Sequence, residues 1–346
     1  MSVTEDARAQ HFLSLLVPAF TKYAGKAIIR PFLRGQPARW GEVTFREWSL
    51  QLAAARLYWL RVLPELGLQP ADVVGLWLTG KEYTDLLNIS SVSAAGYVPQ
   101  LFSPVFTSGM IHTLLNRSNA CGLIYDPRVA RDVAGCLSNI PTTTALNAES
   151  LSALVASCGR GLSEEDLPFV GERQTAAIFH SSGTTCGLPK LIPTSHLLLR
   201  VFITEKFPDC SLDNTQDSSN IFNSLGSLAH VGSFQAFHGA AALGCTTVQA
   251  SSMAMGSTEL RDMVRETGLN RLVQYGTFVA AHIRAAMTDP ELAGVLRGLR
   301  QVLYTGVALG REEERWAREQ GVRLMAMYGT SETGMSLCLS FKGIPG

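Results

Sequence analysis

Short apolar runs alternate with longer amphipathic stretches along nearly the whole chain. The runs have the length of strands, and the stretches between them have the length and spacing of helices. This alternation predicts an α/β protein in which helices cover mostly parallel sheets. The expected strands are VVGLWL (73–78), YVPQLF (97–102), GLIYD (122–126), TTALN (143–147), TAAIF (175–179), KLIP (190–193), NIFNSL (220–225), CTTVQA (245–250), RLVQY (271–275), QVLYTG (301–306), VRLMAMYG (322–329) and MSLCLSF (335–341). The expected helices begin near 45 and 195, end near 95, or cover 107–116, 233–243, 258–267, 277–287 and 311–319.

The stretch TFREW (44–48) indicates where one of these helices begins. Thr44 followed by Glu47 has the spacing of a capping box. A helix that starts there carries Trp48, Leu52 and Ala55 on its inward face.

The alternation weakens between 149 and 174, where the chain reads SCGRGLSEEDLPFVGERQ (157–174). We expect this polar segment to be a surface connection between two α/β units, at about 1–150 and 175–346. No internal repeat is visible. The last expected strand is followed directly by KGIPG (342–346), so we expect that a further, C-terminal part of the protein lies outside this sequence.

Composition fits a globular enzyme better than a disordered or fibrous chain, since 46% of the 346 residues are hydrophobic and 17% are charged. Lys plus Arg equals Asp plus Glu at 29 each, so charge gives no reason to expect a nucleic acid or a membrane surface as partner. No apolar run approaches the ~20 residues of a membrane span.

The seven cysteines are odd in number and scattered, and neither C-x-x-C nor H-E-x-x-H occurs. No disulfide framework or zinc site is therefore indicated. The first residues, MSVTEDARAQ, are not those of a signal peptide. We expect a reduced, cytoplasmic protein.

The first candidate for chemistry is SSGTTCGLPK (181–190), which follows an apolar strand. Glycines that allow close approach, four hydroxyls and a lysine are what a phosphate-binding loop needs. In a P-loop the lysine follows the second glycine directly and opens a helix. Here Leu188 and Pro189 intervene and the lysine lies in a strand, so the spacing excludes a P-loop. A plain Gly/Ser-rich turn is the alternative.

The second candidate, YGTSETG (328–334), also follows an apolar strand. Ligands of α/β proteins bind at the carboxyl ends of parallel strands. A carboxylate beside hydroxyls suits a Mg²⁺–nucleotide complex. The alternative is a surface turn in which Thr330 or Ser331 caps a helix.

Together these motifs make the chain resemble the N-terminal core of the adenylate-forming superfamily, which includes acyl-CoA synthetases, luciferases and peptide-synthetase adenylation domains. SSGTTCGLPK is similar to the Ser/Thr/Gly-rich loop of that family, and YGTSETG to its Tyr-Gly-x-Thr-Glu motif. LYTGVALG (303–310) lies where the family contacts adenine, and LAHVGSF (228–234) where it has an acyl-pocket histidine. The residues of the motifs are most similar to those of fungal peptide-synthetase-like enzymes that pair adenylation with a carrier domain and a reductase or thioesterase.

The resemblance implies two α/β sheet subdomains plus a small β-barrel part, and a role for each residue that matches a motif. Thr185 and Lys190 would hold the β- and γ-phosphates of ATP, and Tyr328 would stack on adenine. Ser331 would contact the α-phosphate and Glu332 would hold Mg²⁺; with Thr185 and Lys190 these are the catalytic candidates. The residues implied to bind ATP are Ser181, Ser182, Gly183, Thr184, Thr185, Lys190, Gly306, Val307, Ala308, Tyr328, Gly329, Thr330 and Ser331.

The implied reaction is attack of a carboxylate oxygen on the α-phosphorus, which forms an acyl adenylate and releases pyrophosphate. The acyl group would pass to a phosphopantetheine thiol on a downstream carrier domain. The family's ribose-binding aspartate, hinge residue and catalytic lysine belong to a C-terminal subdomain beyond residue 346, so we expect these 346 residues alone to adenylate poorly. Cys186 lengthens the phosphate loop by one residue, and the pattern gives it no role.

An aryl acid is the expected substrate. Adenylation domains for α-amino acids place an aspartate where Val231 stands, and no acidic residue occurs between 220 and 258. An unpaired buried ammonium would be costly. His230 is the pocket histidine by resemblance, and a core or helix-capping histidine is its alternative. The substrate-binding candidates are His230, Val231, Phe234, Gln235, Gln274, Tyr275, Thr305, Met327, Gly329, Thr333 and Met335.

Three alternatives remain open at this point. An acyl-CoA ligase would differ only in what accepts the acyl group. A serine hydrolase would use GTSET (329–333), which departs from the G-x-S-x-G elbow at its last position. The third alternative is a nucleotide-binding part without catalysis.

Overall fold

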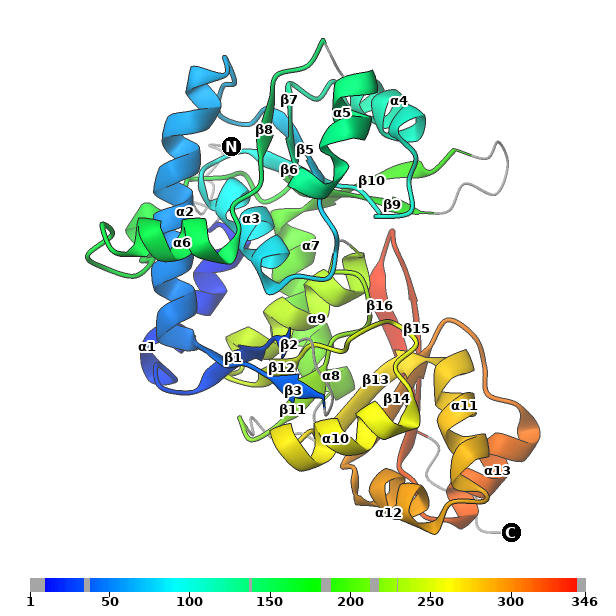
Figure 1. Ribbon diagram of the computed structural model, residues 1–346. Helices are drawn as coiled ribbons and strands as arrows, with labels where there is room; N and C mark the ends of the chain where they lie inside the picture. Colours follow the sequence, from blue (N-terminus) through cyan, green and yellow to red (C-terminus); the bar gives the residue numbers. More distant parts are fainter. Residues whose placement is uncertain are drawn as a thin grey trace, which may run out of the picture. The chain divides into compact units, whose positions relative to one another are not determined.

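The computed structural model describes residues 10–33, 38–136, 139–181, 188–211, 218–228 and 230–340, with the backbone alone for 136, 210–211 and 335–340 (Figure 1). The chain divides into two units. Unit 1 consists of Met1–Gly25, Phe45–Val201 and Leu228–Phe234, and unit 2 of Lys26–Thr44, Phe202–Ser227 and Gln235–Gly346. Each unit has a sheet of its own.

The sheet of unit 1 has six strands in the order β10-β9-β6-β5-β7-β8. Four neighbouring pairs are parallel, and β10 alone runs antiparallel, to β9. The strands are β5 (Val73–Trp77), β6 (Val98–Leu101), β7 (Gly122–Tyr125), β8 (Thr142–Thr144), β9 (Thr175–Ser181) and β10 (Lys190–Ser195). The predicted α/β class with mostly parallel strands is confirmed in this unit.

Helix α2 (Phe45–Glu65) begins one residue after Thr44, where the sequence predicts it. Trp48, Leu52 and Trp59 follow helical spacing and are buried, and the Trp59 Nε1–H donates to Ser91 Oγ (3.0 Å). The other helices of this unit are η1 (Phe12–Leu16), α1 (Val17–Lys22), α3 (Tyr83–Ala94), α4 (Ser108–Ser118), η2 (Pro127–Val129), α5 (Ala130–Cys136), α6 (Ala148–Val155), η3 (Glu164–Asp166) and α7 (His196–Val201).

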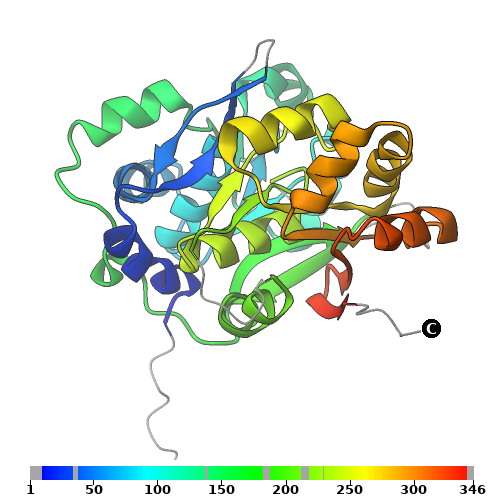
Figure 2. The ribbon, with the colours of Figure 1, turned by 90° about the horizontal axis from the view of Figure 1, so that it is seen from below.

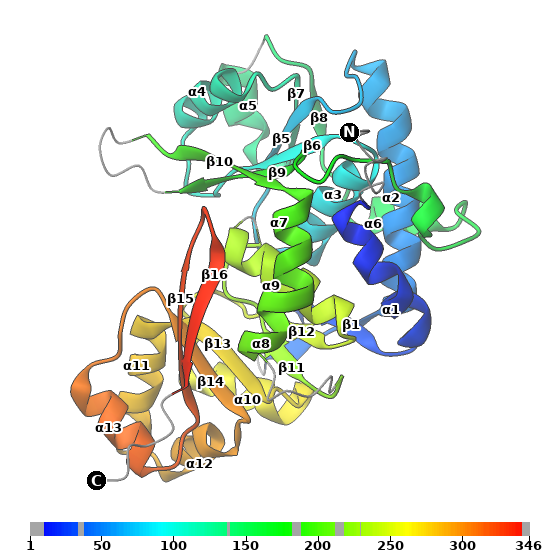
Figure 3. The same ribbon diagram turned by 180° about the vertical axis from the view of Figure 1, so that it is seen from behind.

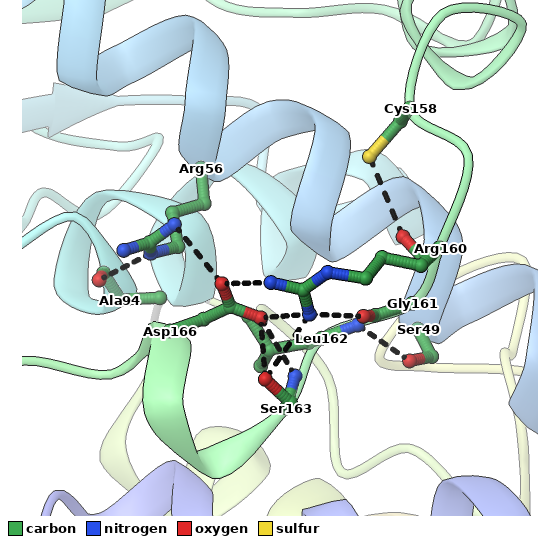
Figure 4. Close-up of polar contacts among 9 residues, drawn as sticks. All are labelled: Ser49, Arg56, Ala94, Cys158, Arg160, Gly161, Leu162, Ser163 and Asp166. Carbon is green, nitrogen blue, oxygen red and sulfur yellow. Dashed lines mark hydrogen bonds and ion pairs between the residues drawn. The ribbon is translucent and has the colours of Figure 1, made fainter.

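The connection before β9 is more ordered than its polar sequence suggests, because α6 and η3 both form in it. Figure 4 shows its anchor: both Nη groups of Arg160 donate to the Asp166 carboxylate (2.7 and 2.8 Å), which also accepts from Ser163. Burial raises the pKa of Asp166, but these bonds outweigh it and bring the pKa to about 2. The connection is tied to α2, since Leu162 N–H donates to Ser49 Oγ (3.0 Å).

The sheet of unit 2 has eight strands in the order β16-β15-β14-β13-β11-β12-β1-β4. The two outermost strands, β16 and β4, run antiparallel to their neighbours, and the other pairs are parallel. The strands are β1 (Ala27–Arg30), β4 (Val43–Thr44), β11 (Ile221–Asn223), β12 (Thr246–Val248), β13 (Arg271–Tyr275), β14 (Gln301–Thr305), β15 (Leu324–Thr330) and β16 (Gly334–Ser340); β2 (Phe32–Leu33) pairs separately with β3 (Arg39–Trp40).

Helices α10 (Ser257–Thr267), α11 (Gly276–Ala286) and α12 (Pro290–Gly298) pack together on this sheet (Figure 2, yellow to orange). Their buried side chains meet those of β13 and β14 in one core. Unit 2 also holds η4 (Phe202–Lys206), α8 (Phe207–Ser211), α13 (Arg311–Glu319) and the part of α9 (Val231–Ala242) from Gln235 onward.

The division of the chain differs from the expected boundary near 150–175. Residues 175–201 belong to unit 1, because β9 pairs with β6 through Gln100 and Ile178. Residues 26–44 belong to unit 2, because β1 pairs with β12. In the parts of the chain that the structure describes, no helix is long and apolar enough to cross a bilayer.

His196 is buried in unit 1 as a neutral imidazole. Its Nδ1 accepts from Phe12 N–H (3.3 Å), so this nitrogen cannot carry a proton without losing the bond. Burial, with a smaller contribution from Arg200, lowers the pKa of His196 from 6.5 to about 4. The unfolded chain therefore binds a proton at higher pH than the folded one, and stability falls as the pH drops from about 6.5 toward 4.

His196→Asn should weaken this acid sensitivity, because Asn Oδ1 accepts from Phe12 N–H and does not titrate. Between pH 7.5 and 4.5 the free energy of unfolding in urea should fall less in this variant than in the wild type, by on the order of 3 kcal/mol. His112→Asn, at an exposed histidine of α4, is the matched control and should fall as the wild type does. An equal acid loss in His196→Asn and wild type would contradict this account.

Candidate functional site

In unit 1 the first motif lies on the β9–β10 hairpin. Ser181 and Lys190 pair across its end, and the Lys190 side chain is exposed. The lysine lies at the start of strand β10, and the next helix begins only at His196, so the exclusion of a P-loop is confirmed. Ser182, Gly183, Thr184, Thr185 and Cys186 lie outside the described residues.

His180 fixes the end of β9, one residue before the loop. One ring nitrogen, Nδ1, is 2.8 Å from Leu101 O and must donate to it, while Nε2 accepts from Gln100 Nε2 (3.2 Å). The ring stacks on Phe102 (5.2 Å between centroids, 19° between planes). Burial lowers the pKa of His180 to about 4, so the ring is neutral at pH 7.

The sequence motifs do not point to His180, because only the fold brings its partners on β6 next to it. The fully buried Gln100 carries this contact further, because its Oε1 accepts from Ser118 Oγ (2.6 Å) at the end of α4. The end of β9, which leads into the first motif, is thus bonded to the centre of the unit 1 sheet.

In unit 2 three neighbouring parallel strands, β13, β14 and β15, bring their carboxyl ends to one edge. Gly306 follows β14 with φ +84°, a conformation that favours glycine, and Val307 N–H donates to Thr305 O (3.0 Å). The carbonyl of Val307 packs against Gly276, where a Cβ would overlap it. The Val307 side chain is 52% exposed, so this loop faces solvent.

The second motif lies on the turn between β15 and β16, which run side by side as a hairpin (Figure 3, red). Thr333 N–H donates to Thr330 Oγ1 (3.2 Å), and Glu332 is exposed. The Tyr328 side chain is 63% exposed, which leaves its ring open to a flat ligand.

The strand β16 after the turn decides between the alternatives for YGTSETG (328–334). A strand follows the turn, so neither Thr330 nor Ser331 caps a helix, and that alternative is wrong. The nucleophile elbow of a hydrolase also requires a strand–turn–helix, so the hydrolase alternative loses its structural basis.

The substrate-binding candidates divide between the units. In unit 1, His230 is exposed and its Nδ1 accepts from Gly232 N–H (3.1 Å), so it caps the start of α9 as its alternative assignment states. Val231 and Phe234 are buried, and the Phe234 ring packs against Phe12 and Phe179.

In unit 2, Gln235 and Gln274 are buried, and two of their amide atoms, Gln235 Nε2 and Gln274 Oε1, have no hydrogen-bond partner within the described chain. Tyr275, Thr305 and Met327 are partly buried at the carboxyl edge of the sheet. The remaining candidates are Gly329 and Thr333, at the turn, and Met335, whose side chain lies outside the described residues.

Glu332 is the candidate for holding a metal ion. No group of three or more His, Cys, Asp or Glu side chains suited to a metal ion occurs in the described residues. Mg²⁺ in nucleotide sites takes one or two carboxylates and otherwise phosphate oxygens and water. A single exposed carboxylate therefore fits Mg²⁺ that arrives with a nucleotide.

Comparison with known proteins gives one family over most of the chain: residues 27–345 match the model described as "AMP-binding enzyme". The AMP-binding domain-containing enzyme iboA of Amanita muscaria is 28% identical over 327 residues, 91% of this chain and 61% of the relative. The adenylate-forming reductase stbB of Stachybotrys bisbyi is 31% identical over 167 residues, 45% of this chain and 14% of the relative. The chain thus spans about three fifths of one relative and a small part of the other.

Among solved structures, the N-terminal subdomain of Klebsiella oxytoca NpsA in complex with 3-hydroxybenzoyl-AMSN has a TM-score of 0.75 to this chain. It is 14% identical, and the match covers 96% of this chain and 76% of that one. At this identity the likeness concerns the fold, and it confirms the expected N-terminal core of an adenylate-forming enzyme.

Gly276→Ala tests the packing under the 306–308 loop. The added methyl group would overlap Val307 O, a backbone atom that cannot move alone, so we expect a loss of about 1–3 kcal/mol in unfolding free energy. Gly294→Ala, within α12, is the control: its Cβ meets nothing closer than 4.0 Å, and alanine in a helix should gain about 0.5–1 kcal/mol. Denaturant unfolding measures both, and equal stability of the two variants would refute the packing argument.

Proposed function

The chain belongs to the family of AMP-binding enzymes, and from this premise we propose that it activates an aryl carboxylic acid, for transfer to a carrier thiol, as the adenylation part of a longer enzyme. Carboxylate adenylation itself follows from the family. The observation that carries the finer proposal is at the carboxyl edge of the unit 2 sheet. Tyr328 and Glu332 are exposed there, and in the same unit the buried Gln235 and Gln274 each have one amide atom without a partner in the described residues.

In the proposed reaction, each residue has the role that the resemblance to the adenylate-forming superfamily implies. Tyr328 stacks on adenine beside the 306–308 loop, and Ser331 donates to the α-phosphate. Lys190, with the hydroxyls of its loop, holds the β- and γ-phosphates, and Glu332 holds Mg²⁺, which neutralises phosphate charge. An oxygen of the substrate carboxylate attacks the α-phosphorus, the bond to the β-phosphate oxygen breaks, and pyrophosphate leaves.

The chain's part in this reaction is positioning and charge neutralisation. No described side chain needs to take a proton, because the attacking carboxylate is already ionised at pH 7. Fixed donors around the transferred phosphoryl group are the main source of catalysis in such reactions.

The proposed acid is aryl and carries no α-ammonium. Val231 cannot pair an ammonium, and Gln235 and Gln274 offer amide groups instead of a charge. Their unpartnered atoms, one donor and one acceptor, suit a polar substituent such as a phenolic hydroxyl. The name of the NpsA complex, which contains a 3-hydroxybenzoyl group, supports this choice for a protein of the same fold.

The proposed acyl acceptor is a carrier thiol. The resemblance to peptide-synthetase-like enzymes implies transfer to a phosphopantetheine thiol on a carrier domain, with a C-terminal adenylation subdomain acting in cis. An adenylate-forming reductase and a non-canonical non-ribosomal peptide synthetase among the relatives support this choice. An acyl-CoA ligase is the alternative. If these 346 residues are tested alone, nucleotide binding without turnover is the expected behaviour.

Substrate class is tested with non-hydrolysable acyl sulfamoyl-adenosines and this chain. The 3-phenylpropanoyl and phenylalanyl compounds differ only in the α-ammonium, so they form a matched pair. We expect the first to bind about 10- to 100-fold more tightly by calorimetry, because the ammonium finds no carboxylate. The benzoyl and 3-hydroxybenzoyl compounds should bind at least as well as the first, and tighter binding of the phenylalanyl compound would overturn the aryl-acid proposal.

Catalysis is tested by acid-dependent ATP–pyrophosphate exchange in a protein that joins this chain to a C-terminal subdomain. Lys190→Ala or Glu332→Ala should lower exchange about 100-fold or more, because each removes a charge from the phosphate site. Lys22→Ala and Glu172→Ala replace exposed residues outside both motifs and serve as controls. Exchange that survives both motif substitutions would show that the residue roles are wrong.

A further inference from the structure

Lys206 is a cation beside the second motif that neither motif contains. It ends η4, a π-helical turn between α7 and α8. Such wide turns are rare and are frequently found at functional sites. The Lys206 Nζ donates to Thr333 O (3.1 Å), in the turn between β15 and β16.

With this bond, both backbone groups of Thr333 have a partner. The N–H of Thr333 donates to Thr330 Oγ1 (3.2 Å), and its carbonyl accepts from Lys206. Ser331 and Glu332 are the two residues between Thr330 and Thr333. The directions of the Ser331 and Glu332 side chains therefore depend on this turn, whose last residue, Thr333, is bonded at its N–H and at its carbonyl.

The exit of the same turn is fixed by α9. Gly334 has φ +66°, and the Gln235 amide lies so close that a Cβ on Gly334 would be 2.7 Å from Gln235 Oε1. A side chain at this position would displace the amide. Two separate elements of unit 2, η4 and α9, thus hold the turn.

We propose that Lys206 is a positioning residue for adenylation, whose ammonium holds the 331–333 turn in the conformation that presents Ser331 and Glu332. This rests on the proposed function. Hydrogen bonds from a charged donor are stronger than those between neutral groups. If this bond selects the working conformation of the turn, its loss lowers the rate about 10- to 100-fold.

The test uses Lys206→Met, which removes the donor but keeps the length of the side chain, and Lys206→Arg, which keeps a charged donor. In the exchange assay, Lys206→Met should lower kcat 10- to 100-fold and raise the Mg²⁺ concentration for half-maximal exchange, with KM for the acid unchanged. Lys206→Arg should restore most of the rate. Lys22→Met, at an exposed lysine, should behave as wild type.

Thermal unfolding separates positioning from folding, and Lys206→Met should have the melting temperature of the wild type. If it unfolds instead, Lys206→Gln, which keeps a neutral donor, takes its place and should show a smaller rate loss. Wild-type kinetics in Lys206→Met, or a loss that Lys206→Arg does not restore, would overturn the inference. Absence of exchange in the wild type would count against the proposed function instead.

Discussion

Both motifs depend on one constraint: each lies where a parallel sheet ends in an antiparallel hairpin. Parallel strands need long crossovers, usually helices, whereas an antiparallel neighbour can follow after a few residues. In unit 1 the chain reverses from β9 into β10, and in unit 2 from β15 into β16. Each reversal occurs at a sheet edge, where backbone and short polar side chains can meet a ligand without displacing a covering helix.

The two hairpins are fixed by different chemistry. The stem of the first is held by a neutral histidine, His180, bonded to the backbone of β6. The turn of the second is held by an ammonium from η4 and by close packing against α9. A buried imidazole keeps these bonds only while it is neutral.

Sequence patterning predicted the elements better than their assembly. All the expected strands form, because a run buried on both faces is visible in the sequence itself. Strand β1, which lies between β12 and β4, and the helix α12 were not expected, although Asp289 and Pro290 give α12 an ordinary N-terminal signal. The sheet that a strand joins depends on distant partners, so residues 26–44 and 175–201 lie in units that chain order did not indicate.

Dependence on distant partners also limits how much of the candidate site can be predicted from the sequence. The motif residues could be identified because their types and spacing are local, whereas Lys206 is 127 positions from its partner Thr333 and has no motif around it. Gln235 links the proposed acid pocket to the second motif. Its amide is part of that proposed pocket and also fills the space beside Gly334, at the exit of the 331–333 turn. A substitution that reshapes the pocket at this position therefore also removes a support of the turn, and its effect on acid preference must be separated from its effect on ATP.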